Sequence, residues 1–389
     1  MKIKFIENNQ LFGIEYDWKL IIKEYKKLNI PKEVYTPTHK HFNRNAWFVD
    51  VSQRGTGKTT NYLLLGMIMN KLYGTILHYV RDLHNMITPK NMQDILSTII
   101  RYNYIEKITD GKWHSAYYRS RRWYYCNRDN DGVIIEKSDI HFMYCCACDE
   151  SATLKSSYQC DTADIIIFDE FISKYNYNGE FVDFVDLLST LIRKRKSAKI
   201  FMLANTIDIE NNMFYELTIA DTIQSMEIGE CVEVTTEKGT NIEIEIIGDK
   251  IQPQTKEHNK LFFGFNNPKL ASITGEGWAT FNYPHIWSEE NIEYIYNGVY
   301  ILHNGKYIRM DIVNTEKIGL CIFAHKATRT YEDSIIYTTE EITDKRFLEF
   351  STDNKPITIF IKDMVRNRRV FYDNNTTGNL FSAFLKSIK

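Results

Sequence analysis

Short apolar runs alternate with amphipathic stretches over the first half of the chain. Two runs, DIIIF and KIFMLA, are nearly continuous, which is typical of strands buried on both faces of a sheet. The alternation of strands and helices along the chain predicts an α/β fold whose central sheet is mostly parallel and covered on both faces. We predict strands at residues 46–52, 74–80, 164–168 and 199–204, and helices at 58–72 and 180–195.

Other segments have a different pattern. Pro89 is expected to open a helix that runs to about Tyr102. Residues 112–126 and 131–147 are rich in Tyr, Trp and Arg and predict antiparallel strands. After about residue 225, residues 232–247 alternate apolar and charged side chains, and 299–325 predict a hairpin meander with Asn304-Gly305 at its first turn. We therefore predict two domains, residues 1–225 and a smaller α+β domain at 226–389.

Composition narrows the class of protein. The 389 residues are 43% hydrophobic with a formal net charge of −2, so nucleic acid could be bound only through local basic patches. No apolar run approaches the ~20 residues that span a bilayer, and no apolar segment of a signal peptide follows the first lysines, so we expect no membrane association. The seven cysteines are an odd number, which favours reduced thiols. Cys145 and Cys148 have the spacing of half a zinc site, but their apolar surroundings favour a buried strand.

The strongest chemical signal is Ser52-Gln-Arg-Gly-Thr-Gly-Lys-Thr59, which follows a predicted strand and opens a predicted helix. That is the context of a phosphate-binding loop, in which backbone N–H groups cradle phosphates, the lysine reaches the β- and γ-phosphates, and the threonine hydroxyl binds Mg²⁺. Ser52 replaces the usual first glycine, and an ordinary glycine-rich turn is the alternative. The predicted nucleotide contacts are Gln53, Arg54, Gly55, Thr56, Gly57, Lys58, Thr59 and Thr60.

Two further strand ends support this interpretation. Ile165–Phe168 is followed by Asp169, which can hold the Mg²⁺ shell, and by Glu170, which can polarise an attacking water as general base. Leu203-Ala-Asn205-Thr206 ends the next strand, where Asn205 can sense the γ-phosphate. The alternatives are acidic residues that merely begin a loop and an Asn-Thr turn. Because no Asn-Lys-x-Asp guanine-reading motif is found, we predict ATP, with Mg²⁺, rather than GTP.

Two basic segments are candidates for contacts with other molecules. Arg193-Lys-Arg-Lys196 ends the predicted helix, where basic residues favour the helix dipole. Four in a row also suggest an arginine finger, Arg195 or Arg193, that acts on a neighbouring subunit, and Arg54 is a second candidate acting in cis. Residues 112–128 combine five basic and six aromatic residues with no acidic one. They could contact DNA through Lys112, Arg119, Arg121 and Arg122, or form a solvated hairpin with its aromatic residues in the core.

As a set, these motifs resemble the DNA-packaging ATPases, or encapsidation proteins, of phi29-like phages, relatives of the large terminase subunits. The resemblance covers about residues 40–225 and rests on QRGTGKT, IIFDEF, IRKR and LANT. It implies an ASCE-type P-loop fold and a ring of subunits, usually five, at the portal of a prohead in the host cytoplasm. Double-stranded DNA would be pumped inward as ATP is hydrolysed. Lys58, Thr59, Asp169, Glu170 and Asn205 would act as described above.

The resemblance also implies a C-terminal domain of RNase H-like nuclease fold that has lost its metal centre. Only Asp311 is a plausible strand carboxylate, and we expect it to be an ordinary surface residue, so no nuclease activity is expected. Two other functions remain compatible with the residues: a helicase-like or segregation motor on nucleic acid, and a nucleotide-switched binding module in which hydrolysis is vestigial.

Overall fold

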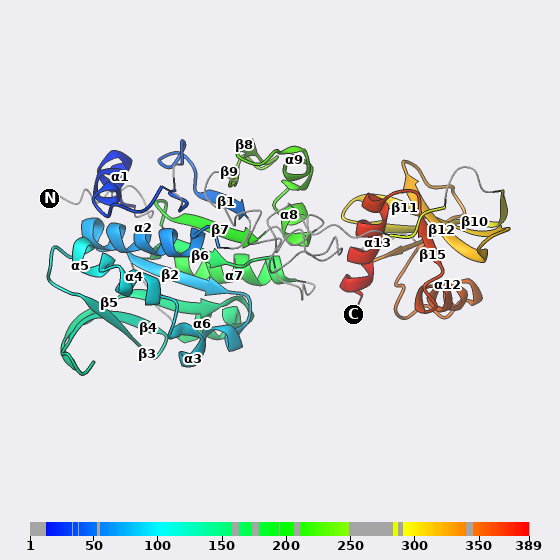
Figure 1. Cartoon of the computed structure of the whole chain (residues 1–389). Coiled ribbons are helices and arrows are strands. Elements are labelled where there is room, and N and C mark those ends of the chain that lie inside the picture. The colour runs from blue at the N-terminus through cyan, green and yellow to red at the C-terminus, as the bar shows by residue number, and fades with distance from the viewer. Residues whose placement is uncertain are drawn as a thin grey trace.

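The computed structural model describes most of the chain. It covers residues 13–32, 34–37, 39–52, 55–157, 163–172, 179–193, 195–205, 211–248, 283–286, 291–339 and 345–388. Two bodies are built around two separate sheets, one of nine strands and one of six (Figure 1).

The nine-stranded sheet has the order β3-β4-β5-β2-β6-β7-β1-β9-β8. Its six central strands, from β5 to β9, are parallel, and antiparallel strands extend both edges. This confirms the predicted mixed α/β fold with a large, mostly parallel sheet. The strands are β1 (Trp47–Ser52), β2 (Ile76–Arg81), β3 (Ser115–Arg119), β4 (Arg122–Arg128), β5 (Ile134–Ala147), β6 (Ala163–Asp169), β7 (Lys199–Asn205), β8 (Cys231–Thr235) and β9 (Asn241–Ile246).

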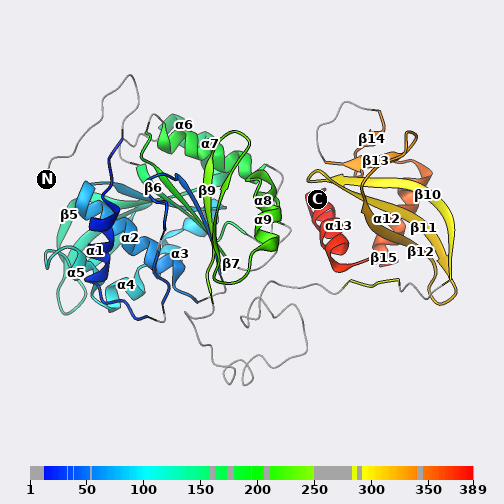
Figure 2. The ribbon, with the colours of Figure 1, turned by 90° about the horizontal axis from the view of Figure 1, so that it is seen from above.

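Helices cover both faces of this sheet (Figure 2). One apolar core joins α1 (Trp18–Lys26), α2 (Lys58–Tyr73), α4 (Ser97–Arg101) and α5 (Tyr104–Ile108) to one face. A second core joins α6 (Ser151–Ser157), α7 (Glu180–Ile192), α8 (Asn212–Glu216) and α9 (Ala220–Ser225) to the other. Both cores contain residues of the central strands, which explains why β6 and β7 are apolar on both faces.

The predicted helix from Pro89 to Tyr102 is wrong in detail. The chain forms η1 (His84–Ile87), the single turn α3 (Pro89–Met92) and the separate α4, followed by α5. Thr88 caps α3, and its hydroxyl accepts a hydrogen bond from the Asn91 N–H. The buried side chains Met92, Leu96 and Ile99 follow helical spacing although the backbone turns between them. Apolar periodicity alone therefore overestimated the length of this helix.

The predicted domain boundary at residue 225 is also wrong. Residues 231–246 form β8 and β9, and β9 pairs in parallel with β1 of the first sheet. The first domain therefore extends at least to Ile246. The alternation of apolar and charged residues correctly predicted strands, but such a pattern carries no information on which sheet a strand joins.

The second sheet has the order β14-β13-β10-β11-β12-β15. The predicted meander is confirmed, because β10, β11 and β12 are antiparallel neighbours. Asn304 and Gly305 both have positive φ in the first turn, the conformation that Asn-Gly favours in tight hairpins. The elements are β10 (Ile292–His303), β11 (Lys306–Thr315), β12 (Gly319–Ala327), β13 (Ile335–Thr338), β14 (Phe347–Leu348), α12 (Pro356–Arg366), β15 (Val370–Tyr372) and α13 (Asn375–Ser387).

Asp311 on β11 is not the surface residue that the sequence suggested. It is 1% exposed, and Arg309 Nε and His325 Nε2 lie 2.8 Å and 2.9 Å from its two carboxylate oxygens. Ion pairing compensates the burial of this carboxylate, which is why a strand position inside the sheet tolerates it.

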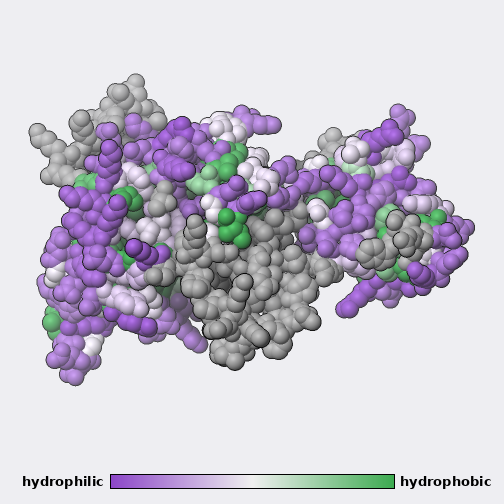
Figure 3. All heavy atoms as spheres, turned by 45° about the horizontal axis from the view of Figure 1, so that its top comes forward, coloured by the Kyte–Doolittle hydropathy of each residue, from purple (hydrophilic) through white to green (hydrophobic). Residues whose placement is uncertain are grey.

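The surface is mainly polar on the face shown in Figure 3, where apolar residues form only small, scattered patches on both bodies. Among the described residues, no helix has the length and apolar character needed to cross a membrane.

Candidate functional site: a phosphate-binding loop with two carboxylates

The loop between β1 and α2 depends on glycine at two positions. Gly55 and Gly57 have φ values of 81° and 84°, which side chains rarely adopt. A Cβ at Gly57 would lie 2.6 Å from Val34 Cγ1, so a larger residue would also collide with the segment behind the loop. Lys58 is the first residue of α2, whose free N–H groups and positive dipole end favour a bound anion.

Lys58 is buried at the centre of this arrangement, with 6% of its surface exposed. Its amine donates to the Ser52 hydroxyl and, over 3.2 Å, to the Asn205 side-chain carbonyl. Burial lowers the pKa of Lys58 to about 8, although the charge of Asp169 opposes the shift. Ser52, which replaces the usual first glycine, therefore provides a hydrogen-bond partner for Lys58. Bound phosphates would restore the full positive charge of the Lys58 amine.

Thr59 faces Asp169 across the sheet edge. The Thr59 hydroxyl lies 3.0 Å and 3.1 Å from the two Asp169 carboxylate oxygens. Asp169 also accepts a 2.8 Å hydrogen bond from the Tyr79 hydroxyl, and its pKa is raised by burial despite the nearby charge of Arg81. A hydroxyl beside a carboxylate, next to a phosphate-binding loop, is a donor set that fits Mg²⁺ and its water ligands.

Glu170 is the second carboxylate and has a distinct conformation. Its φ is 55°, a left-handed value that is unusual for a side chain of this size and often occurs at functional sites. One of its carboxylate oxygens lies 2.5 Å from an Arg81 guanidinium nitrogen, and the Glu170 side chain is 52% exposed. The carboxylate thus borders the cavity and is held by a cation from β2.

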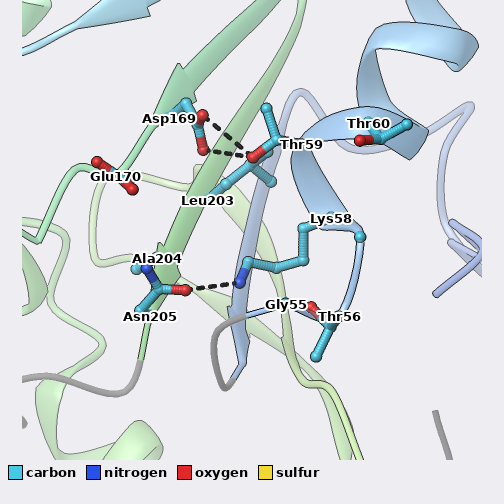
Figure 4. Close-up of a pocket in the computed structure, with 11 residues that line it drawn as sticks. Gly55, Thr56, Lys58, Thr59, Thr60, Asp169, Glu170, Leu203, Ala204 and Asn205 are labelled. Carbon is cyan, nitrogen blue, oxygen red and sulfur yellow. Dashed lines mark hydrogen bonds between the residues drawn. The ribbon is translucent and has the colours of Figure 1, made fainter. Parts of the chain in front are cut away.

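These groups line one cavity of about 380 Å³. In Figure 4 the Lys58 amine, the Thr59 hydroxyl and the Asp169 carboxylate point toward the same space, and Asn205 approaches from the end of β7. The lining residues are Gly55, Thr56, Gly57, Lys58, Thr59, Thr60, Asp169, Glu170, Leu203, Ala204 and Asn205. Of the predicted nucleotide contacts, Gln53 and Arg54 lie outside the described residues.

The sequence interpretation missed Tyr79 and Arg81. Both lie at the end of β2, which pairs with β6 directly beside Asp169. The Tyr79 hydroxyl accepts from Arg81 over 3.2 Å and donates to Asp169, so the two residues form one polar chain. The available signal was that Tyr79 and Arg81 stand at alternate positions of this short strand and therefore on one face, the face on which Asp169 lies.

The two candidate arginine fingers differ in environment. Arg195 forms an ion pair with Asp164, which is completely buried, while the Arg195 side chain is 13% exposed. Asp164 lies at the opposite end of β6 from Asp169. Arg193 is exposed, and its Nε donates to the Thr190 carbonyl over 3.2 Å at the end of α7. Arg195 therefore has a structural partner in its own subunit, which does not fit the predicted finger role.

The predicted DNA-contacting residues lie along β3 and β4 or next to them. Arg121 forms two hydrogen bonds with Glu150, of 2.5 Å and 2.6 Å, so its charge is neutralised within the chain. The Arg122 guanidinium lies over the Tyr144 ring and the Lys112 amine over the Trp113 ring, at 5.4 Å in both cases. Arg119 and Lys112 are exposed. Trp123 and Tyr125 are buried in the core, as the hairpin alternative expected, and contact with DNA stays a prediction.

Comparison with solved structures identifies related folds. The Phi-28 gp11 DNA packaging motor is 19% identical, with 92% of this chain and 99% of that chain covered and a TM-score of 0.52. The bacteriophage Phi-29 viral genome packaging motor assembly contains a chain that is 16% identical, with the same coverage and a TM-score of 0.53. The chain shares its fold with these packaging motors. No protein-family model and no curated protein matches the sequence.

The resemblance inferred from the motifs is thus confirmed at the level of fold. The motifs covered about residues 40–225 of the chain, whereas the shared fold covers 92% of it. The second domain therefore belongs to the fold that this chain has in common with the packaging motors.

A prediction follows from the contact between Arg81 and Glu170. The substitution Arg81→Ala should raise ATP turnover without DNA by about two- to fivefold, because a partly exposed ion pair contributes ~0.5–1 kcal/mol and its loss frees the Glu170 carboxylate. Steady-state phosphate release measures this effect, with Arg81→Lys as the charge-preserving control. Lower turnover with unchanged nucleotide affinity would instead assign Arg81 a role in stabilising the transition state.

Proposed function

We propose that this chain is a subunit of an ATP-driven motor that moves double-stranded DNA into a viral prohead. The observation that carries the proposal is the convergence of Lys58, Thr59, Asp169 and Glu170 on one cavity, within a fold shared with two packaging motors. The strand order supports an ASCE-type ATPase, because β7 with Asn205 lies between the strand of the phosphate loop and the strand of the carboxylates.

The residues have separate roles in hydrolysis. The loop amides and Lys58 would bind and orient the phosphates. Asn205 would sense the γ-phosphate through its contact with Lys58. Glu170, released from Arg81, would take the proton of the attacking water. Mg²⁺, held by Thr59 and by Asp169 through water, would supply neutralising charge at the phosphates when bound.

Three contacts with other molecules belong to the same proposal. Arg193 at the exposed end of α7 is the better candidate for a residue that acts on a neighbouring subunit of a ring, five-membered by the resemblance. Lys112, Arg119 and Arg122 are the candidates for contacts with DNA phosphates. The portal of the prohead would be the docking site of the ring, in the host cytoplasm.

The second domain is proposed to be an RNase H-like domain without nuclease activity. Its central antiparallel meander, with β13 parallel to β10 and β14 next to β13, supports this fold. Both carboxylate oxygens of Asp311 are already engaged, one in an ion pair with Arg309 and the other in a contact with His325 Nε2, whereas a catalytic metal would need them as ligands. The full chain should not nick plasmid DNA in the presence of Mn²⁺, and Mn²⁺-dependent nicking would overturn this part.

The decisive experiment measures ATPase activity of the full chain with and without duplex DNA and proheads. We expect strong stimulation when both are present, together with protection of the DNA from nuclease inside the prohead. Strand separation of a duplex would favour a helicase-like motor instead. Nucleotide binding without any turnover would favour a nucleotide-switched binding module.

A further inference from the structure

Strands β1 and β9 lie side by side in the first sheet (Figure 1). They carry a cluster of polar side chains that are buried or half-buried. Asp50 on β1 is the direct neighbour of Glu245 on β9. Asp50 is 1% exposed, and Glu245 is half-buried. Two carboxylates in this position repel each other, because the low dielectric of the interior strengthens interactions between charges.

One tyrosine hydroxyl serves both carboxylates. Tyr35 Oη lies 2.9 Å from Glu245 Oε2 and 3.2 Å from Asp50 Oδ2. A hydroxyl carries one hydrogen, so it can donate to only one of the two groups at a time. Tyr62 donates to the same oxygen of Asp50, but Asp50 Oδ1 is buried with no hydrogen-bond partner. A proton bound by either carboxyl group would relieve the repulsion between the two.

Titratable side chains from several neighbouring segments surround the Asp50–Glu245 pair. His39 Nε2 contacts the Tyr62 hydroxyl at 2.6 Å, and Lys58 acts on Asp50 through its charge. Glu243 accepts from the Lys40 and His41 N–H groups at 3.1 Å and 3.0 Å, and Cys231 Sγ lies 3.6 Å from it.

The electrostatics of these neighbours single out the pair. Burial raises the pKa of Glu245 to about 7, with repulsion from Asp50 adding to the shift, and burial likewise raises the pKa of Asp50. The pKa of Glu243 is lowered, since its hydrogen bonds and the contact with His39 outweigh its burial. Burial raises the pKa of Cys231 to about 12 and those of Tyr35 and Tyr62 above their ordinary value. The carboxyl pair therefore differs from Glu243, Cys231 and the two tyrosines, because it alone among these acidic groups is shifted toward neutral pH.

The pair is connected to the phosphate loop by short contacts. The Tyr35 N–H donates to the Thr56 carbonyl over 3.1 Å, and Val34 packs against Gly57. Asp50 precedes Ser52 by two residues on β1, and Ser52 accepts from Lys58. A triphosphate in the cavity adds negative charge close to the pair and draws the positive charge of Lys58 toward itself. Both effects favour the protonated form of the carboxyl pair.

We propose that Asp50 and Glu245 jointly hold one exchangeable proton, and that nucleotide binding at the phosphate loop is coupled to uptake of that proton. Neither residue touches the nucleotide cavity, so both are positioning residues that act through Tyr35 and Lys58. This inference rests on the proposed ATPase function and concerns the regulation of the same site by pH.

The sign of the effect follows from linkage. Because the bound state holds more protons than the free state, affinity should fall as the pH rises through the region where the pair titrates. We compare the fall in affinity for a Mg²⁺-bound, non-hydrolysable ATP analogue between pH 6 and pH 8. This fall should be about threefold larger for the wild-type chain than for Glu245→Gln. Contributions from the γ-phosphate and from Lys58 are common to both proteins and cancel in the comparison.

Isothermal titration calorimetry at pH 7, in buffers with different ionisation enthalpies, counts the protons directly. Wild type should take up about 0.3–0.5 proton more than Glu245→Gln. Glu233→Gln is the matched control, because Glu233 lies on the adjacent strand β8 with its own partner Arg44 and should leave the proton count unchanged. Tyr35→Phe keeps both carboxyl groups but removes their shared donor, so its proton uptake should move to higher pH.

The outcomes are distinguishable. Equal proton uptake by wild type and Glu245→Gln would overturn the inference while leaving the ATPase proposal intact. If Glu245→Gln does not fold, an unshifted pH profile in Tyr35→Phe has the same consequence. Failure of the wild-type chain to bind the analogue at any pH would overturn both proposals.

Discussion

Replacing Glu170 with glutamine should reduce ATP turnover by about 10²–10⁴-fold and leave nucleotide affinity nearly unchanged. A glutamine has the size of the native side chain but cannot accept the proton of the attacking water. In the part of the chain that the structure describes, no hydrogen bond or ion pair joins Glu170 to Lys58 or Thr59, and its charge is only a minor influence on the Lys58 pKa. Its side chain is 52% exposed, so its replacement should not disturb the phosphate loop. Single-turnover phosphate release and equilibrium titration with a fluorescent ATP analogue separate the two effects.

Glu106→Gln on α5 provides the control, because Glu106 is exposed and lies on a helix outside the cavity. It should retain wild-type turnover. Normal turnover in Glu170→Gln would refute the assignment of the general base. A parallel loss of affinity and turnover would indicate that Glu170 supports the nucleotide site itself.

The central strands could be predicted because burial on both faces leaves a continuous apolar run. In β6 the residues from Ile165 to Phe168 are at most 1% exposed, and in β7 the run from Ile200 to Ala204 is similarly covered. Each run ends in polar residues at the same edge of the sheet, since parallel strands all end there. This is why Asp169 and Asn205 could be assigned to one site before their distance was known.

The sequence could not reveal which distant segments pair. The parallel contact between β9 and β1 joins residues 195 positions apart, and no local pattern encodes such a partner. The same limit applies to Asp311, which is compensated by Arg309, two residues earlier on the same face of β11, but also by His325 of the neighbouring strand. Arg81 was missed for this reason as well, because its contact with Glu170 exists only once β2 and β6 are adjacent.

Position in the fold also distinguishes the two candidate arginines. Arg193 and Arg195 are equivalent in the sequence, where both belong to a basic run after an amphipathic helix. In the fold, Arg195 points to the start of β6 and compensates a buried carboxylate, whereas Arg193 is exposed. Removing a charge that neutralises a buried partner lowers the stability of the fold. The effect of each arginine on stability can be measured independently of catalysis.

Arg195→Ala should lower the free energy of unfolding by about 3–5 kcal/mol, because it leaves the carboxylate of Asp164 buried without its cation. Asp164 is 0% exposed and would retain only polar neighbours such as the Ser197 hydroxyl. Urea denaturation followed by circular dichroism measures the change. Arg193→Ala should alter stability by less than about 1 kcal/mol, as expected for an exposed side chain.

The double variant Asp164→Asn/Arg195→Met tests the cause of this loss. Removing both charges eliminates the unpaired buried carboxylate, so much of the stability lost in Arg195→Ala should return. If Arg195→Ala instead unfolds like wild type but loses DNA-stimulated turnover, and mixing it with Glu170→Gln subunits restores part of that turnover, the ion pair contributes little. Arg195 would then be the residue that acts across the subunit boundary, in place of Arg193.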